Sequence, residues 1–229
     1  MKRNYFVAGT DTGVGKTLVT SAMLHSASQM KLQTLGLKPV AAGCDESEHG
    51  LANEDALSLM AFSSVQIPYQ QVNPVALTEA IAPHIAAVND GKRLQAERIA
   101  GHCRGAMMQA YDLCLLEGAG GWRVPLNARE TMADIVKALQ VPVVLVVGIR
   151  LGCLNHALLT AEAITRDGLK LAGWVANVVE DGMPELEANV GTLQSLLPCP
   201  QLGLIPFRKG ISAPEASEYL DIKNLLESA

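Results

Sequence analysis

A glycine-rich segment near the start of the chain has the residue types and spacing of a phosphate-binding loop. The segment Gly13-Val14-Gly15 directly precedes Lys16-Thr17. Glycines let successive backbone N–H groups turn toward phosphate oxygens, and the helix expected from Leu18 adds the positive end of its dipole. Lys16 would reach the β- and γ-phosphates of a nucleotide, and Thr17 would bind Mg²⁺. The segment therefore predicts a site for a nucleoside triphosphate and its metal ion.

The loop departs from the strict pattern at one position. The pattern requires glycine five positions before Gly15, but Thr10 stands there and Gly9 lies one residue earlier. The apolar run 5–8 precedes the loop, so strand, loop and helix follow in the order that a phosphate loop needs. The alternative is a glycine-rich turn before an ordinary helix.

Two acidic residues are candidates to complete the metal site. Glu117 follows the apolar run 113–116 and precedes a Gly-Ala-Gly-Gly turn, which predicts a carboxylate at a strand end facing the loop. Mg²⁺ takes six oxygens, commonly including one or two carboxylates, and Asp55 is the candidate for the second. Asp55 is equally compatible with a structural acid near the start of the helix expected at 54–62, stabilised by the helix dipole.

Three further side chains carry reactive groups. Lys38 ends a strand predicted at 34–38, which we expect to be central; there its charge would join that of Lys16 beside a transferring phosphate. The alternative is an edge strand with Lys38 in solvent. His84 could carry a proton, but no acid neighbours it in sequence, which favours a loop histidine. Cys153 has no base marked in the sequence, which favours a small buried residue over a nucleophile.

Alternating apolar runs and helical patterns predict the fold that must position these residues. The continuous runs 113–116, 143–147 and 171–176 are typical of strands buried on both faces, and a last strand is expected at 202–205. Helices are expected at 54–62, 98–111, 131–139, 155–167 and 184–197, and 66–91 is expected to be irregular. The alternation predicts a single α/β domain over 1–229, a P-loop fold with a mostly parallel central sheet and helices on both faces.

Composition and charge exclude several classes of partner. The 229 residues carry 18 Lys and Arg against 23 Asp and Glu, for a net charge of -5, without the basic clustering that nucleic acid requires. The apolar runs are too short for a membrane span or a signal peptide. The five cysteines form no C-x-x-C pair and are expected to be reduced and mostly buried. We therefore expect a cytoplasmic protein with neither a nucleic-acid nor a membrane partner.

The ordered set of motifs resembles that of dethiobiotin synthetases over nearly the whole chain. The phosphate loop alone is shared by many nucleoside triphosphatases, whereas the ordered set is specific. Its markers are the loop 9–17, Lys38-Pro39-Val40 with Gly43, Asn53 and Asp55, Asn73-Pro74, Pro83-His84, and the segments 117–121, 151–156 and 173–177. The resemblance implies a homodimeric ligase of biotin biosynthesis that converts 7,8-diaminopelargonate, CO₂ and Mg·ATP into dethiobiotin, ADP and phosphate.

The resemblance also implies roles for residues at matching positions. The nucleotide would be held by Gly13, Val14, Gly15, Lys16 and Thr17, by Glu117 and Gly118, and on the adenine side by Asn177, Pro206 and Phe207. Mg²⁺ would be held by Thr17, Asp55 and Glu117, and the reacting groups would be stabilised by Lys16 and Lys38. The substrate would contact Thr12, Lys38 and Gly120, with its carboxylate on a helix N-terminus of the partner subunit that corresponds to Gly152, Cys153 and Asn155.

Two departures from the family pattern and two competing functions remain. Ala42 stands where some relatives carry a serine that touches the substrate, and 207–214 matches poorly, so the preference for ATP is not fixed. An amidating ligase of the cobyrinate diamide synthase type usually needs a glutaminase domain, for which 229 residues leave no room. An ATPase switch of the septum-placement type typically has a second lysine near Thr10 or Asp11 and often a membrane-binding tail, and the chain shows neither.

Overall fold

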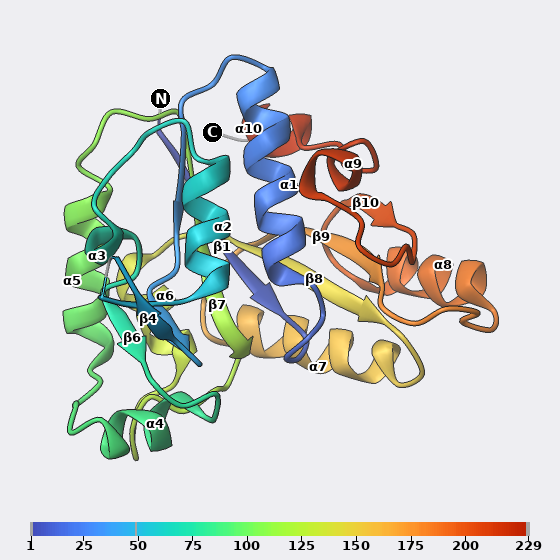
Figure 1. Cartoon of the computed structure of the whole chain (residues 1–229). Coiled ribbons are helices and arrows are strands. Elements are labelled where there is room, and N and C mark those ends of the chain that lie inside the picture. Colours follow the sequence, from blue (N-terminus) through green and yellow to red (C-terminus); the bar gives the residue numbers. More distant parts are fainter. Residues whose placement is uncertain (1, 49, 228–229) are drawn as a thin grey trace.

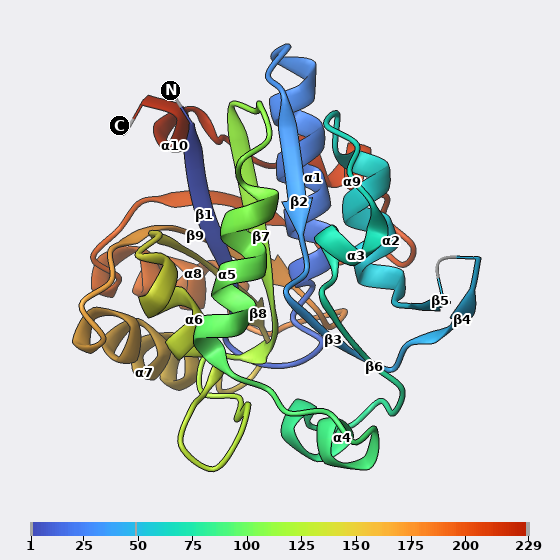
Figure 2. The same ribbon diagram turned by 90° about the vertical axis from the view of Figure 1, so that its left-hand side faces the viewer.

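A computed structural model describes residues 2–48 and 50–227 of the chain. Its central sheet has six parallel strands in the order β10-β9-β8-β1-β7-β2, with helices on both faces (Figures 1 and 2). The predicted α/β class with a parallel sheet is confirmed. The strands are β1 (Arg3–Gly9), β2 (Thr34–Leu37), β7 (Leu113–Gly121), β8 (Val143–Ile149), β9 (Leu171–Val178) and β10 (Gln201–Ile205).

Burial from both sides explains why the inner strands are continuous apolar runs. Every residue of β8 is buried, and β1 lies between β7 and β8, with Val7 opposite Glu117 and Val144. Alternate side chains of β1 enter different cores: Tyr5 and Val7 pack with α1, whereas Phe6 packs into the opposite layer. Parallel neighbours need long crossovers, which the helices supply.

The helices form a layer on each face of this sheet. One layer contains α1 (Lys16–Gln29), α9 (Ala213–Ser217) and α10 (Lys223–Glu227). The other contains α5 (Ala96–Ala106), α6 (Met132–Leu139), α7 (Cys153–Arg166) and α8 (Leu186–Leu196). The helix expected at 98–111 instead begins at Ala96 and ends at Ala106, so it is shorter than predicted.

The segment 66–91 contains regular elements, so the prediction that it is irregular is wrong. It forms α3 (Tyr69–Val72), β6 (Val75–Leu77) and α4 (Pro83–Asn89). Prolines begin these pieces instead of breaking them: Pro68 caps α3, and Pro83 is the first residue of α4. Upstream, β3 (Val40–Ala42) pairs with β6, α2 (Glu54–Phe62) matches its predicted bounds, and β4 (Asp45–Ser47) pairs with β5 (Gly50–Ala52).

The strand before Lys38 is not central, which corrects a second expectation. β2 is the edge strand of the sheet and ends at Leu37. Lys38 nevertheless is only 3% exposed, because the segment after α3 covers it. The Lys38 backbone N–H donates to the Val72 carbonyl at 2.9 Å, and Asn73 Nδ2 donates to the Lys38 carbonyl at 2.6 Å. Lys38 therefore lies neither at the end of a central strand nor in solvent at an edge strand, so both alternatives from the sequence are wrong.

Two predictions about the whole chain concern membranes and thiols. Across residues 2–48 and 50–227, no helix has the length and apolar character needed to cross a bilayer. All five cysteines are free thiols, and only Cys199 is not fully buried, as predicted.

Candidate active site

The glycine-rich loop joins the end of β1 to the start of α1. Lys16 is the first residue of the helix, and Gly15 caps it with φ +85°, a left-handed conformation that glycine adopts without strain. A Cβ on Gly15 would collide with the side-chain nitrogen of Asn177, which donates to the Val14 carbonyl at 2.9 Å. The end of β9 thus supports the loop through Asn177, the residue predicted to lie near the nucleotide.

The Lys16 ammonium lies over the phosphate loop, where it would contact a bound phosphate. Its Nζ donates to the Asp11 carbonyl at 3.0 Å, and the residue is 7% exposed. Burial and the nearby charge of Lys38 lower the pKa of Lys16 to about 8, although the surrounding carboxylates act in the opposite direction. A phosphate anion would stabilise this charged form, so the group is suited to binding one.

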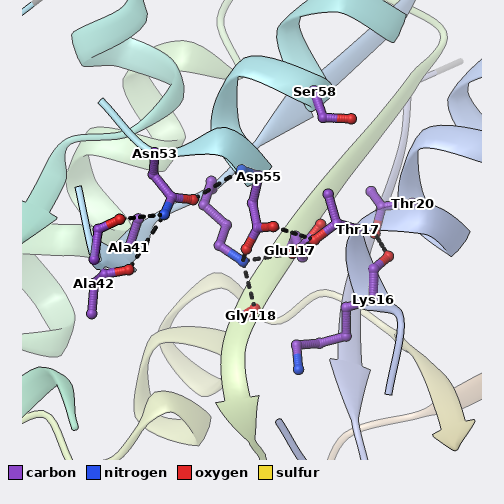
Figure 3. Close-up of polar contacts among 12 residues, drawn as sticks. Lys16, Thr17, Thr20, Ala41, Ala42, Asn53, Asp55, Ser58, Glu117 and Gly118 are labelled. Atoms are coloured by element: carbon purple, nitrogen blue, oxygen red, sulfur yellow. Dashed lines mark hydrogen bonds and ion pairs between the residues drawn. The ribbon is translucent and has the colours of Figure 1, made fainter. Parts of the chain in front are cut away.

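Thr17, Asp55 and Glu117 meet at one point from three separate elements (Figure 3). The Thr17 hydroxyl lies 2.7 Å from Asp55 Oδ1 and 2.9 Å from Glu117 Oε1. Thr17 stands in the first turn of α1, Asp55 in the first turn of α2, and Glu117 inside β7. The structure therefore brings together the three residues expected at the metal site.

Lys38 bridges the two carboxylates of this cluster. Its Nζ lies 2.8 Å from Asp55 Oδ2, 2.5 Å from Glu117 Oε1 and 3.3 Å from the Gly118 carbonyl oxygen. Burial opposes the charge, but the two carboxylates outweigh it and hold the pKa of Lys38 above its usual value. Burial likewise opposes the charge of Asp55, yet Lys38, Thr17 and Lys16 keep the pKa of Asp55 below its usual value. Lys38 and Asp55 are thus both charged at neutral pH.

One carboxylate oxygen in the cluster lacks a hydrogen-bond partner among the described residues. Glu117 is fully buried, its Oε1 accepts from Lys38 and Thr17, and its Oε2 is unsatisfied. Leaving a charged oxygen buried and unpaired is unfavourable unless a ligand satisfies it. A hydroxyl and two carboxylates are hard oxygen donors of the kind that Mg²⁺ prefers, and Mg²⁺ completes such sites with water and phosphate. The residues present therefore fit Mg²⁺.

A cavity of about 690 Å³ opens in front of this cluster. Its polar wall carries Thr12, Lys16, Lys38 and Gly120, all predicted to contact nucleotide or substrate. Another part of the wall is apolar, and apart from Ala42 and Pro83 its residues were not singled out from the sequence, because small apolar residues carry no chemical signal. This apolar wall is formed by Ala41, Ala42, Ala80, Ile81, Ala82, Pro83, Val124 and Pro125.

Several predicted site residues lie outside this cavity. Gly152 caps α7 with φ +92°, and Asn155 in the first turn is exposed. Cys153 is 3% exposed and its N–H donates to the Arg150 carbonyl, so its thiol is the buried group that the sequence favoured. Phe207 is exposed beside Pro206, which follows the β10 residue paired with Asn177. The roles of these residues stay predictions.

Sequence reasoning missed an ion pair that ties the phosphate loop to the segment before α7. Arg150 donates to Asp11 Oδ2 at 2.7 Å, and Asp11 Oδ1 accepts the Thr12 N–H at 2.7 Å. A charged residue directly after the apolar strand β8 was the available signal, the same one that identified Glu117. His84 lies in α4 and not in a loop, and it does not line the cavity.

A phosphate loop at the start of α1, with carboxylates and a lysine at the carboxyl ends of a parallel sheet, defines a P-loop nucleoside triphosphatase. Residues 3–215 match the family model described as an AAA domain. Two solved structures share the fold. The septum site-determining protein MinD with Mg-ADP from Pyrococcus horikoshii OT3 has a TM-score of 0.57 at 17% identity, covering 100% of this chain and 90% of that one. The signal recognition particle receptor FtsY from Elizabethkingia anophelis has a TM-score of 0.55 at 14% identity, covering 99% and 66%.

Curated relatives match the chain from end to end. The ATP-dependent dethiobiotin synthetase BioD of Cellvibrio japonicus is 56% identical, with 99% of each chain covered. The enzyme of that name from Marinobacter nauticus is 49% identical with the same coverage, and that from Pseudomonas aeruginosa UCBPP-PA14 is 49% identical over 96% of this chain and 97% of its own. The chain belongs to the ATP-dependent dethiobiotin synthetase family.

Proposed function

We propose that the chain closes the ureido ring of dethiobiotin from 7,8-diaminopelargonate and CO₂ at the expense of ATP. The observation that carries the proposal is Lys38, held 2.8 Å from Asp55 and 2.5 Å from Glu117 at the phosphate end of the cavity. The relatives named above support the identity of the substrate, because they match over nearly their full length.

The proposed chemistry has three steps. One amine of the substrate captures CO₂ as a carbamate. A carbamate oxygen then attacks the γ-phosphorus of ATP, which releases ADP and forms a mixed carbamic-phosphoric anhydride. The second amine attacks the carbonyl carbon of this anhydride, phosphate leaves, and the ring closes. The second step brings two anions together, the carbamate and the γ-phosphate, so cations at the site lower its barrier.

Lys38 is the group that we assign to the carbamate. An ammonium has three N–H donors, and its contacts with Asp55 and Glu117 are shorter than the 3.3 Å contact with the Gly118 carbonyl. A carbamate oxygen would replace that third, longer contact. Lys16 would leave the Asp11 carbonyl for the phosphates, and the apolar wall would keep water from the anhydride.

Mg²⁺ would be held by Thr17, Asp55 and Glu117. When bound, it would neutralise charge on the transferring phosphoryl group. The unsatisfied Glu117 Oε2 supports this assignment from the protein side.

We further propose that the active form is a homodimer. Lys16 and Lys38 are the only cations that line the cavity within the described residues, and both serve its phosphate end. A substrate carboxylate therefore needs donors from elsewhere. The start of α7 is at the surface, where Leu151 is 93% exposed. Cys153 uses its N–H internally, so the donors that we assign are the first-turn N–H groups of Leu154 and Asn155 of a second copy.

The proposal is tested by incubating the protein with Mg·ATP, bicarbonate and 7,8-diaminopelargonate and measuring dethiobiotin by mass spectrometry. Phosphate release is measured with and without the diamine. We expect product, and phosphate release that depends on the diamine and stops with a chelator. Release that ignores the diamine would favour a switch ATPase instead. The proposal places this reaction in the cytoplasm, which the five free cysteines support.

A further inference from the structure

A second hollow, of about 340 Å³, lies between β6 and the start of α5. It shares no lining residue with the active-site cavity. Figure 2 shows α5 and the β3–β6 pair on the same side of the molecule, with α4 below them. The lining comes from two stretches, Pro74–Ala76 and residues 91–95 with Arg98, Ile99 and His102. We call it the cationic pocket, after Lys92, Arg93 and Arg98.

The charge of the cationic pocket is one-sided. Lys92, Arg93 and Arg98 carry fixed positive charges, His102 lies one turn after Arg98, and no acidic residue is in the lining. Within residues 2–48 and 50–227, the side chains of Arg93, Arg98 and His102 have neither a hydrogen bond nor an ion pair with the protein. Two arginines without an acidic partner around one hollow stand out in a chain with a net charge of -5.

A second arginine of α5, Arg104, is neutralised by contacts within the protein. Arg104 donates to Glu97 at 2.6 Å and to the Ala138 carbonyl at 2.7 Å. Arg98 has no such partner, although it belongs to the same helix. The difference separates a structural arginine from one that is free to bind an anion.

We propose that the cationic pocket binds a phosphate group, either free or as a small phosphomonoester. A guanidinium group presents paired N–H donors that match phosphate oxygens, and a doubly charged anion uses several cations better than a single carboxylate does. Val75, Leu94 and Ile99 form an apolar floor that fits the carbon part of an ester. The volume lies at the lower end of the range for small-ligand sites.

The pocket adjoins the segment that continues into the active-site wall. Lys92 Nζ donates to the Ala76 carbonyl at 2.6 Å and lies 3.2 Å from Asp90 Oδ2, which also accepts the Thr78 N–H at 3.1 Å. A phosphate in the pocket would compete with Asp90 for Lys92. The backbone amide of Thr78, two residues before the cavity wall begins, is therefore a reporter of occupancy.

The test is an NMR titration of the isotope-labelled full chain with sodium orthophosphate, against sodium chloride at matched ionic strength. We expect saturating shifts of the His102 ring signals and of the Thr78 amide with phosphate only. Arg98→Gln should weaken this response at least tenfold, and Arg166→Gln, at an exposed arginine at the end of α7, should leave it unchanged. Glycerol phosphate serves as the ester: tighter binding than orthophosphate identifies an organic ligand, and equal or weaker binding identifies free phosphate.

Two results would overturn the proposal: equal responses to chloride and to both phosphates, or a phosphate response that Arg98→Gln leaves intact. The phosphate loop also binds phosphate, but its Gly13 and Gly15 signals report that event separately and should respond in every variant. A failure in the cationic pocket therefore leaves the proposed catalytic function untouched.

Discussion

At the scale of single residues, the site depends on charges that are buried in mutual contact. Lys38 and Glu117 are 3% and 0% exposed, so neither can exchange its partner for water. Such a pair contributes little net stability, but removing one member leaves the other charge uncompensated. Burial and the nearby charge of Lys38 lower the pKa of Lys16, whereas Glu117 and Asp55 raise the pKa of Lys38 against the effect of burial. The pKa values of the two lysines thus shift in opposite directions, because Lys38 is in direct contact with both carboxylates.

The first prediction separates the structural contribution of the Lys38–Glu117 pair from its catalytic contribution. Lys38→Met leaves Glu117 buried without its cation, and we expect a loss of about 3–5 kcal/mol in the free energy of unfolding. The double variant Lys38→Met/Glu117→Gln should recover most of that stability, while dethiobiotin formation stays at least about 100-fold below wild type. Denaturant unfolding and turnover measure the two effects. Activity that returns together with stability would show that Lys38 has only a structural role.

The second prediction concerns the pH dependence of nucleotide binding. Because the pKa of Lys16 is lowered to about 8 in the free protein, the side chain carries a positive charge below this pH and loses that charge as the pH rises through it. Bound phosphates stabilise the charged form, so ADP binding above about pH 8 takes up a proton and weakens by up to about tenfold per pH unit. Calorimetry without Mg²⁺ measures the affinity.

The matched control for this pH dependence is Lys16→Arg. Arginine keeps its charge throughout this range, so the decline of affinity above about pH 8 should disappear. An equal decline in both proteins would assign the titration to a different group.

At the scale of elements, the site is the meeting point of strand ends and helix starts. β1 leads into the phosphate loop, β7 supplies Glu117, and the first turns of α1 and α2 supply Thr17 and Asp55. The end of β9 supports the loop through Asn177 and Val14. The distances between these side chains are set by packing between elements far apart in the chain, so a change in that packing alters the phosphate loop.

The third prediction tests the close approach of β9 to the loop. Gly13 and Gly15 both have positive φ, but only at Gly15 would a Cβ meet another atom, the amide nitrogen of Asn177. Gly13→Ala should lower the stability of the nucleotide-free protein by about 1–2 kcal/mol through backbone strain. Gly15→Ala should lower it by about 1–3 kcal/mol more through overpacking.

The double variant Gly15→Ala/Asn177→Ala removes the colliding side chain. Its stability should return to about that of Gly13→Ala in thermal unfolding. If the single Gly15 and Gly13 variants are equally stable, the contact with Asn177 does not limit the loop.

At the scale of the whole molecule, the proposed homodimer needs a surface on which two copies meet. α4 and α7 lie along the same side of the molecule in both views (Figures 1 and 2), and both expose apolar residues: Ile85 and Val88 on α4, and Leu159 on α7. Exposed apolar side chains on these helices are available for an interface. The single-domain organisation over 1–229 also stays a prediction at this scale.

The fourth prediction is that the start of α7 serves the site of the other subunit. Proline is tolerated in the first turn of a helix but removes the N–H, so Asn155→Pro should abolish turnover, whereas Asn155→Ala keeps that donor and should retain it. Mixing Asn155→Pro with Lys38→Met/Glu117→Gln should then restore activity in heterodimers, because one of the two sites is intact. Heterodimers verified by native mass spectrometry that show no activity would contradict the shared site.

The sequence by itself determined the parallel α/β fold and pointed to Lys16, Thr17 and Glu117, because glycine spacing, continuous apolar runs and polar residues after such runs are local signals. For Asp55 it left a metal ligand and a structural acid equally open. It did not determine the edge position of β2, the elements within 66–91, or the cationic pocket. Those features depend on which segments pack against one another: Lys38 is buried beside Asp55 and Glu117 because the end of α3 covers it. Such enclosure arises only when distant segments pack together, and the tertiary structure alone decides it.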